Sequence, residues 1–414
     1  MTDDDSDTPP ADPGPPPPGR SVGDSAPTAP APWGAPAPIA EAHDEVNGPE
    51  VPGAKAPKRR TWPWVLVIVV VVALFVASRI NLDYYAIQPG TAQSVQPFIT
   101  VPPGKAHPVS HPVLLTDVEI GRVSALSYLF YKVQGNTTLE PVGAVTGGTP
   151  PSQLDAQGQL EMSQAESYAK TAALRRLGYT VTATPAGAVV YGTFPGTPAY
   201  HALAVGDVVT AVDGVATPTA LGLTSTLRQY HSGQTVTLAV RKGGTGGPTP
   251  VPLTLKSTVV DLGGGYKAAL DVGLLPEDQV DYAYPFPVSI DVTDIGGPSA
   301  GLAMTLGVID ALTAGSLTGG HTVAATGTID SSGKVGDVGG VPQKTIAVEN
   351  AGASVFLVPP QEYRAAMSKD RPGLKIFAVS TLDQALVVLA AHGGTAVGTA
   401  ASPPAPGRQA ALAG

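Results

Sequence analysis

Apolar positions spaced by three and four residues predict three helices in the last third of the chain. They cover residues 300–314, about 339–350 and 382–389. Short apolar runs bounded by turn residues predict strands between these helices. The runs are 286–292, 322–329, 354–358 and 375–379, and a short helix is predicted at 362–367. Strands that alternate with helices indicate an α/β or α+β domain, which we place at residues 258–392.

The middle of the chain has a different pattern, because apolar and polar residues alternate strictly at 234–241. Such alternation is typical of a half-buried strand. A shorter apolar strand is predicted at 188–191 and a helix at 219–230. We therefore predict a small β-rich domain at residues 187–257.

The region before that domain, residues 81–186, is also predicted to be β-rich. It has a strand at 112–118 and a helix at 161–177, which ends at Gly178.

One uncharged apolar run extends from Trp62 to Ser78 and is long enough to cross a bilayer as a helix. We predict a transmembrane helix at residues 61–80. The basic cluster Lys58-Arg-Arg60 precedes the run and favours a cytoplasmic N-terminus, with the rest of the chain outside the cytoplasm. A cleaved signal peptide is the alternative, and the long segment before the run argues against it.

The ends of the chain have the composition of disordered tails. Residues 1–57 contain 15 of the 43 prolines. They also contain ten acidic residues and only two basic ones, Arg20 and Lys55. That tail has a net charge of −8 within a total of −9, so the remainder is nearly neutral. Residues 393–414 are rich in Gly, Ala and Pro. The acidity therefore belongs to the first tail and gives no information about a substrate.

Two classes of site are excluded by composition and motif. The chain contains no Cys, which rules out disulfides and Cys-based metal sites. It also lacks the His-Glu-x-x-His motif of many metalloproteases. We predict no metal and no cofactor.

A candidate nucleophile lies in Gly296-Gly-Pro-Ser-Ala-Gly301, directly before an apolar helix. Pro298 suits the first turn of a helix, which places Ser299 at a helix N-terminus. Free backbone N–H groups there can stabilise an oxyanion. The alternative is an ordinary helix-capping serine in a glycine-rich loop.

A candidate base lies on the next predicted helix, which begins in Gly339-Gly-Val-Pro-Gln-Lys344. Helical spacing places Lys344 on the same face as Ala347, Val348 and Ala351. Burial on that face lowers the pKa of a lysine, and a neutral amine can accept a proton from a serine. The alternative is a lysine that extends along the apolar face into solvent. Lys334 lies in a turn pattern and is predicted to be solvated.

The ordered motifs Gly297-Pro-Ser-Ala-Gly301, Thr326-Gly327 and Gly339-Gly-Val-Pro-Gln-Lys344 resemble the Ser–Lys proteolytic domain of the Lon protease family. The resemblance covers about residues 261–391. It implies that Ser299 is the nucleophile, that Lys344 is its base, and that Thr326 lies close to this lysine. Gly297, Pro298 and Ala300 would support the nucleophile. The sequence departs from the family at two positions, with Gly296 and Thr328 where acids are usual.

The pattern Pro195-Gly-Thr-Pro-Ala199 followed by Gly206-Asp-Val-Val209 resembles bacterial protease-associated PDZ domains. Such a domain binds extended chain at a sheet edge. The strand and the loop before it give the candidate substrate-binding residues Ala186, Gly187, Ala188 and Val189. The alternative is a small β domain that acts only as a spacer.

Together these features are similar to the membrane-anchored, PDZ-containing branch of Lon-like serine proteases. We expect an ATP-independent serine endopeptidase that acts on extracytoplasmic or membrane-associated polypeptides, with the PDZ domain presenting them. The expected partners are polypeptides and a membrane, with no nucleic acid, and the resemblance suggests a ring of identical copies. The competing prediction is a catalytically silent PDZ scaffold at the membrane, which the residues at 296 and 328 keep open.

Overall fold

The computed structural model describes residues 62–147, 149–261, 267–292, 295–369 and 372–397. These residues all belong to one unit of the chain, Thr61–Gly414. The predicted tail at 1–57 and most of the one at 393–414 lie outside the described residues.

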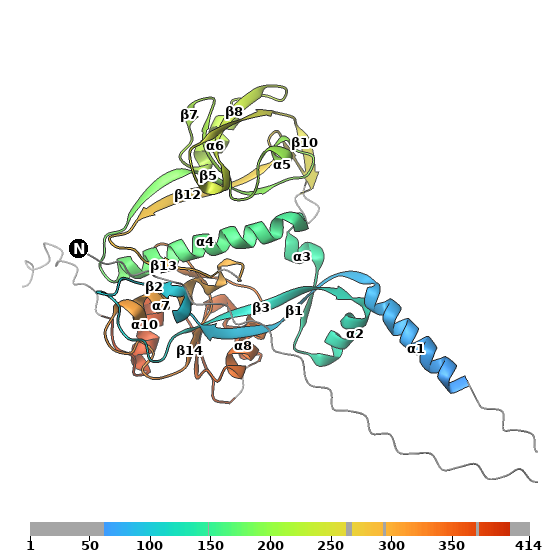
Figure 1. The fold of residues 1–414 in the computed structure, drawn as a ribbon, viewed down its shortest axis with the longest axis vertical. Coiled ribbons are helices and arrows are strands. Elements are labelled where there is room, and N and C mark those ends of the chain that lie inside the picture. The colour runs from blue at the N-terminus through green and yellow to red at the C-terminus, as the bar shows by residue number, and fades with distance from the viewer. Residues whose placement is uncertain (1–61, 148, 262–266, 293–294, 370–371, 398–414) are drawn as a thin grey trace, which may run out of the picture. The chain divides into compact units, whose positions relative to one another are not determined.

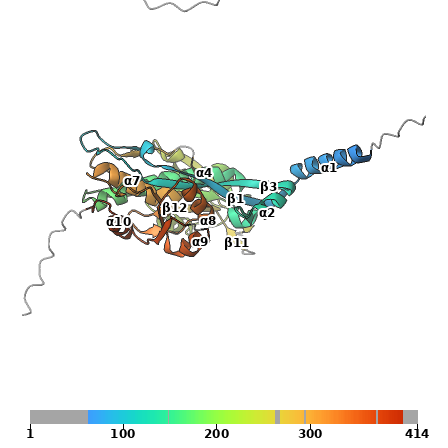
Figure 2. The same cartoon turned by 90° about the horizontal axis from the view of Figure 1, so that it is seen from below.

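The apolar run forms helix α1, Trp62–Arg79, as predicted (Figure 2). None of its 18 residues is buried. Among the described residues, it is the one helix long and apolar enough to cross a membrane.

A six-stranded sheet joins the strands predicted in the last third of the chain to strands from the region after α1. Its order is β18-β17-β14-β3-β1-β4. The four strands β3, β14, β17 and β18 run parallel, whereas β1 is antiparallel to both β3 and β4. The strands are β1 (Asn81–Ser94), β3 (Leu114–Ser124), β4 (Thr138–Pro141), β14 (Val323–Ala325), β17 (Val355–Val358) and β18 (Lys375–Ala378).

Alternate side chains of the central strands point to opposite faces of this sheet and build two cores. Val323 and Ala325 belong to a core shared with helices α4, α7 and α10. Ala324 and Phe356 belong to a second core shared with α8 and α9. Helices therefore cover both faces, as in a three-layer α/β arrangement. The helices are α4 (Pro151–Arg176), α7 (Gly301–Leu312), α8 (Val341–Asn350), α9 (Tyr363–Met367) and α10 (Leu382–Ala391).

A second sheet forms a smaller body with its own buried core (Figure 1). Its strand order is β12-β5-β6-β8-β9, and β7 pairs with β6. The strands are β5 (Thr182–Thr193), β6 (Val208–Val212), β7 (Val215–Ala216), β8 (Thr235–Arg241), β9 (Thr249–Thr254) and β12 (Leu274–Ala283), with helices α5 (Pro198–Ala202) and α6 (Ala220–Leu227). Its assignment as a PDZ-type domain stays a prediction.

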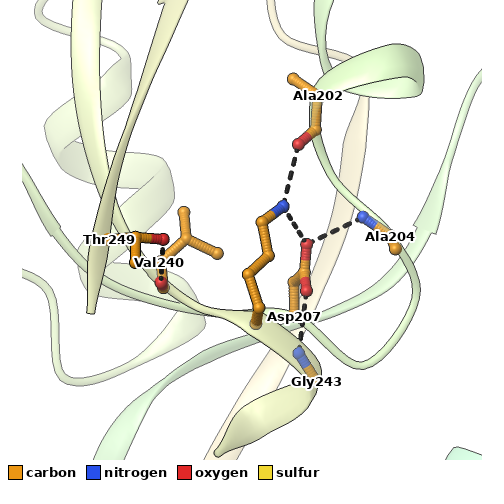
Figure 3. A network of polar contacts seen from close by, with 7 residues as sticks. Ala202, Ala204, Asp207, Val240, Gly243 and Thr249 are labelled. Atoms are coloured by element: carbon orange, nitrogen blue, oxygen red, sulfur yellow. Dashed lines mark hydrogen bonds and ion pairs between the residues drawn. The ribbon is translucent and has the colours of Figure 1, made fainter. Parts of the chain in front are cut away.

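Asp207 fixes the turn that leads into β6 (Figure 3). Its buried carboxylate accepts hydrogen bonds from the backbone N–H groups of Ala204 and Gly243 and pairs with Lys242 Nζ at 2.8 Å. A buried carboxylate needs such partners to offset its lost hydration. The aspartate of the Gly-Asp-Val-Val pattern therefore has a structural function.

Helix α4 runs between the two sheets and contacts elements on both sides (Figure 1). Its apolar residues Met162, Ala165 and Ala169 pack in the core with α7. On its other side, Gln153 bonds to Thr193 of β5 at 3.0 Å and Gln157 bonds to the carbonyl of Tyr191 at 2.9 Å.

The remaining elements are short. They are η1 (Gln96–Phe98), β2 (Ile99–Thr100), α2 (Ala125–Gln134), α3 (Val142–Thr146), η2 (Lys242–Gly244), β10 (Thr258–Asp261), β11 (Lys267–Leu270), β13 (Ser289–Ile290), η3 (Pro298–Ala300), β15 (Thr328–Ile329), β16 (Val335–Gly336) and η4 (Pro360–Glu362).

The sheets cross the domain boundaries predicted from the sequence. Strands β1, β3 and β4 come from the predicted membrane-proximal region 81–186, yet they complete the large sheet. Strand β12 falls inside the predicted proteolytic domain 258–392, yet it pairs with β5 along its length. Hydrogen bonding between strands that are far apart in the sequence sets these boundaries, and the local amino-acid composition does not reveal it.

Individual elements differ in length from their predictions. Helix α4 begins at Pro151, ten residues before the predicted start at Glu161. The strand predicted at 286–292 is reduced to β13. The one predicted at 322–329 is interrupted at Thr326 and Gly327, because Gly327 has a φ of 143° that few other residues adopt.

Candidate active site

Ser299 lies in the 3₁₀ turn η3, which continues directly into α7, so it is at a helix N-terminus as predicted. Gly297 precedes the turn with a φ of 87°, a conformation that glycine allows. Pro298 occupies the first position of the turn, and Ala300, its last residue, is buried. The backbone N–H of Gly297 also donates to the carbonyl of Gly158 in α4 at 2.9 Å. The loop is therefore held against α4.

Lys344 reaches the serine from the second turn of α8. Its Nζ lies 2.7 Å from Ser299 Oγ and 3.1 Å from Thr326 Oγ1. The side chain is only 2% exposed, which excludes the alternative of a lysine that extends into solvent. The residues brought together here, Ser299, Lys344 and Thr326, are the three that the Lon resemblance indicated.

The start of α8 is packed closely against the first strands of the large sheet. Gly340 caps the helix with a φ of 69°, and a Cβ at this position would lie 2.8 Å from Val118 and 3.4 Å from Ile87. Any larger residue would push α8 away from β1 and β3. Residues more than 200 positions earlier thus form part of the surroundings of Lys344.

Burial lowers the pKa of Lys344 to about 8, because the ammonium loses its hydration. The negative charge of Asp117 on β3 opposes this shift. A substantial fraction of the amine is therefore neutral near physiological pH, which is the form that can accept the proton of Ser299.

The break in the strand at Thr326 and Gly327 connects the serine loop to the sheet. The Thr326 hydroxyl donates to the Ser299 carbonyl at 3.3 Å, and the Gly327 N–H donates to the same carbonyl at 3.0 Å. The Gly327 carbonyl in turn accepts from the N–H of Leu302 at 3.0 Å. These bonds fix the backbone of Ser299 relative to the amine.

The two positions that lack the family acids also lie at this site. A Cβ at Gly296 would lie 3.6 Å from Gly158 of α4, and Thr328 begins β15. A carboxylate reaches the loop from another element, because Glu161 Oε2 lies 4.0 Å from where a Cβ on Gly297 would be. Sequence reasoning missed Glu161, since its only signal was a place on a predicted helix.

The predicted substrate-binding residues do not form a free sheet edge in the described structure. Gly187, Ala188 and Val189 pair with β12 on one side, and Ala188 and Val189 pair with β6 on the other. Both of these side chains are buried, and the Ala186 carbonyl accepts a hydrogen bond from Arg241. The expectation of an open edge here is corrected, because β12 occupies it.

No group of three His, Cys, Asp or Glu side chains in the described residues is arranged to hold a metal ion. Lys334 is exposed in the turn after Asp330, as predicted.

Comparison with known proteins supports this geometry. Residues 291–391 match the family model of the Lon protease (S16) C-terminal proteolytic domain. This segment is therefore similar to a Lon-type serine peptidase domain, and we refer to it as the Lon-type domain. Ser299, Lys344 and Thr326 all lie inside it.

Several Lon proteases match this chain over less than a third of its length. Lon protease 2 of Bacillus subtilis (strain 168) is 36% identical over 115 residues, 28% of this chain and 20% of the relative. The Lon protease of Rickettsia bellii (strain RML369-C) is 32% identical over 123 residues, 28% of this chain and 15% of the relative. The Lon protease of Clostridioides difficile (strain 630) is 46% identical over 63 residues, 15% of this chain and 8% of the relative. The chain thus spans a fifth or less of the length of these relatives.

We expect Ser299→Ala and Lys344→Arg each to reduce peptide cleavage by at least about a thousandfold. The first removes the hydroxyl, and the second replaces the amine by a guanidinium that stays protonated and cannot act as a base. Steady-state cleavage of a fluorogenic peptide by the full chain in detergent measures both. Lys375→Arg, at an exposed position on β18, is the matched control and should cleave like the parent. A folded Lys344→Arg chain that keeps parental activity would disprove a lysine base.

The pH dependence of cleavage should follow the neutral fraction of Lys344. Because its pKa is lowered to about 8, kcat/KM should rise about tenfold per pH unit below that value and level off above it. Initial rates from about pH 6 to about pH 10, with circular dichroism to verify folding, test this. A rate that falls across this range, or does not change, would exclude an amine that must be neutral.

Proposed function

We propose that the chain is a membrane-anchored serine endopeptidase in which Ser299 is the nucleophile and Lys344 the base. The observation that carries this proposal is the 2.7 Å contact between a buried amine and the Ser299 hydroxyl inside a Lon-type domain. Neutral Lys344 accepts the Ser299 proton as Oγ attacks a peptide carbonyl carbon. The resulting ammonium then protonates the leaving amine, and an ester to Ser299 remains.

Hydrolysis of that ester completes the reaction. Water attacks the ester carbonyl carbon and gives a proton to Lys344. As the ester C–O bond breaks, the Lys344 ammonium returns that proton to Ser299 Oγ, and the carboxylic acid product leaves. The backbone N–H of Ser299, at the start of η3, has no preceding turn to bond to, so it can stabilise the oxyanion in both steps. Thr326 positions the amine, since its hydroxyl contacts Lys344 Nζ and bonds back to the Ser299 carbonyl.

The competing function is a silent scaffold, suggested by Gly296 and Thr328. A fluorophosphonate-type probe that reacts with activated hydroxyls separates the two. A peptidase would be labelled, and Ser299→Ala would abolish the labelling. A scaffold would show the same low labelling in the parent chain and in the Ser299→Ala variant.

The smaller domain is proposed to be PDZ-like and to guide polypeptide toward Ser299. Because β12 fills the edge of β5, this guidance is proposed to use Tyr191 of β5 and Glu277 of β12, which line a cavity together with Pro298 of the serine loop. A ring of copies, suggested by the Lon resemblance, stays a prediction.

We expect cleavage of an unfolded protein by the purified full chain to be the same with and without ATP. The sequence contains no Gly-x-x-x-x-Gly-Lys-Ser/Thr loop to hold nucleotide phosphates. Gly243-Gly-Thr-Gly-Gly247 lacks the lysine, and Gly263-Gly-Gly-Tyr-Lys267 has the wrong spacing. Gel-based degradation of a reduced, unfolded protein measures this, with Ser299→Ala as the blank. An ATP requirement in the absence of any partner would refute it.

Helix α1 is proposed to anchor the chain with its N-terminus in the cytoplasm. Its 18 residues span about 27 Å, close to the hydrocarbon thickness of a bilayer. The basic residues at 58–60 precede it. Protease added outside intact cells should therefore digest the smaller and Lon-type domains and leave the 1–57 tail intact. Digestion of the tail alone would show the inverse orientation.

A further inference from the structure

A cavity of about 380 Å³ lies beside the serine loop. Its walls come from three parts of the chain: α4 contributes Glu161, the smaller domain contributes Tyr191 and Glu277, and the Lon-type domain contributes Pro298 and Thr328. This volume is within the range of about 300–1,000 Å³ that is usual for ligand pockets.

Two connections place the cavity next to the reacting hydroxyl. Pro298 directly precedes Ser299 in η3. Gly327, which directly precedes Thr328, donates its N–H to the Ser299 carbonyl. A polypeptide bound with its scissile bond at Ser299 can therefore place a neighbouring side chain in this cavity.

In the described structure, two carboxylates of the cavity, Glu161 and Glu277, have no cationic partner. Glu161 accepts a hydrogen bond from the Tyr191 hydroxyl, and Glu277 accepts one from Gln164 at 3.4 Å. Within the described part of the chain, neither carboxylate has a Lys, Arg or His nitrogen in ion-pair range, since the recorded pairs involve other residues. Asp330 and Lys334 add one charge of each sign, so the lining is negative overall.

Glu277 loses part of its hydration where it faces the cavity. Partial burial raises the pKa of Glu277, and the nearby charge of Glu161 raises it further, against the hydrogen bond from Gln164. A cationic group that enters the cavity would relieve both effects, because it offers the charge partner that the protein does not supply.

We propose that this cavity is a specificity site that takes a lysine or arginine side chain of the polypeptide substrate, held by Glu161 and Glu277. The inference rests on the proposed peptidase function and adds its substrate class. It also gives the smaller domain a direct part in substrate choice, because Glu277 lies on β12.

The preference is measured first by binding, so that it does not depend on cleavage. The Ser299→Ala full chain in detergent is titrated against fluorescent peptides that are identical except for one Arg, Gln or Glu residue. The Arg peptide should bind about tenfold more tightly than the Gln peptide, since a charge-assisted hydrogen bond contributes roughly this much. The Glu peptide should bind most weakly.

The isosteric variants Glu277→Gln and Glu161→Gln, made in the Ser299→Ala chain, should bring the Arg-to-Gln ratio close to one. Each keeps the shape and the acceptor oxygen, so the bonds from Gln164 and Tyr191 are preserved. Asp155→Asn is the matched control, because it removes an exposed carboxylate from the same helix α4 and should leave the ratio unchanged. Thermal unfolding of each variant verifies folding.

Cleavage by the chain with Ser299 intact gives the second measurement. Mass spectrometry of products from a peptide library should show Lys or Arg at one fixed position from the scissile bond. Equal binding of Arg and Gln peptides, or a preference that survives both Glu variants, would overturn the inference. Arg-selective binding that depends on Glu277, with no Ser299-dependent cleavage, would support the site and refute the peptidase function.

Discussion

The site depends on one lysine amine that is kept out of water. A charged ammonium is costly in such surroundings, and burial therefore moves the pKa of Lys344 to about 8. The same burial that disfavours the charge places Nζ at 2.7 Å from Ser299 Oγ. Packing and the proposed proton transfer thus depend on the same constraint.

The architecture around the amine follows from that constraint. Helix α8 must approach the sheet closely, and Gly340 permits this approach to Val118 and Ile87. The serine must be held at the correct distance, and the strand break at Thr326 and Gly327 bonds to its carbonyl. Strands β1 and β3 are therefore part of the Lon-type unit, although they lie far before the matched segment 291–391 in the chain.

The smaller domain is connected to the same site through β12 and α4. Strand β12 completes the smaller sheet, and the chain then passes through β13 to the serine loop. Tyr191 bonds to Glu161 of α4, whose Oε2 is close to Gly297. The smaller domain thereby forms a wall of the cavity beside Ser299. This contribution to the site is more direct than the binding of an added strand at β5 would be.

The sequence by itself determined the local elements and the chemistry that short motifs carry. Helical spacing predicted α7, α8 and α10, and the Gly-Pro-Ser-Ala-Gly and Gly-Gly-Val-Pro-Gln-Lys motifs identified Ser299 and Lys344. Helical spacing and short motifs both depend on residues that are close together in the chain, and the sequence shows these directly. Only the tertiary structure decided that β1 and β3 join the large sheet, that β12 covers the edge of β5, and that Glu161, Tyr191 and Glu277 meet. These contacts join residues up to about 210 positions apart, as in the pairing of Leu114 with Ala324, and no local pattern encodes which distant partner a strand or carboxylate will find.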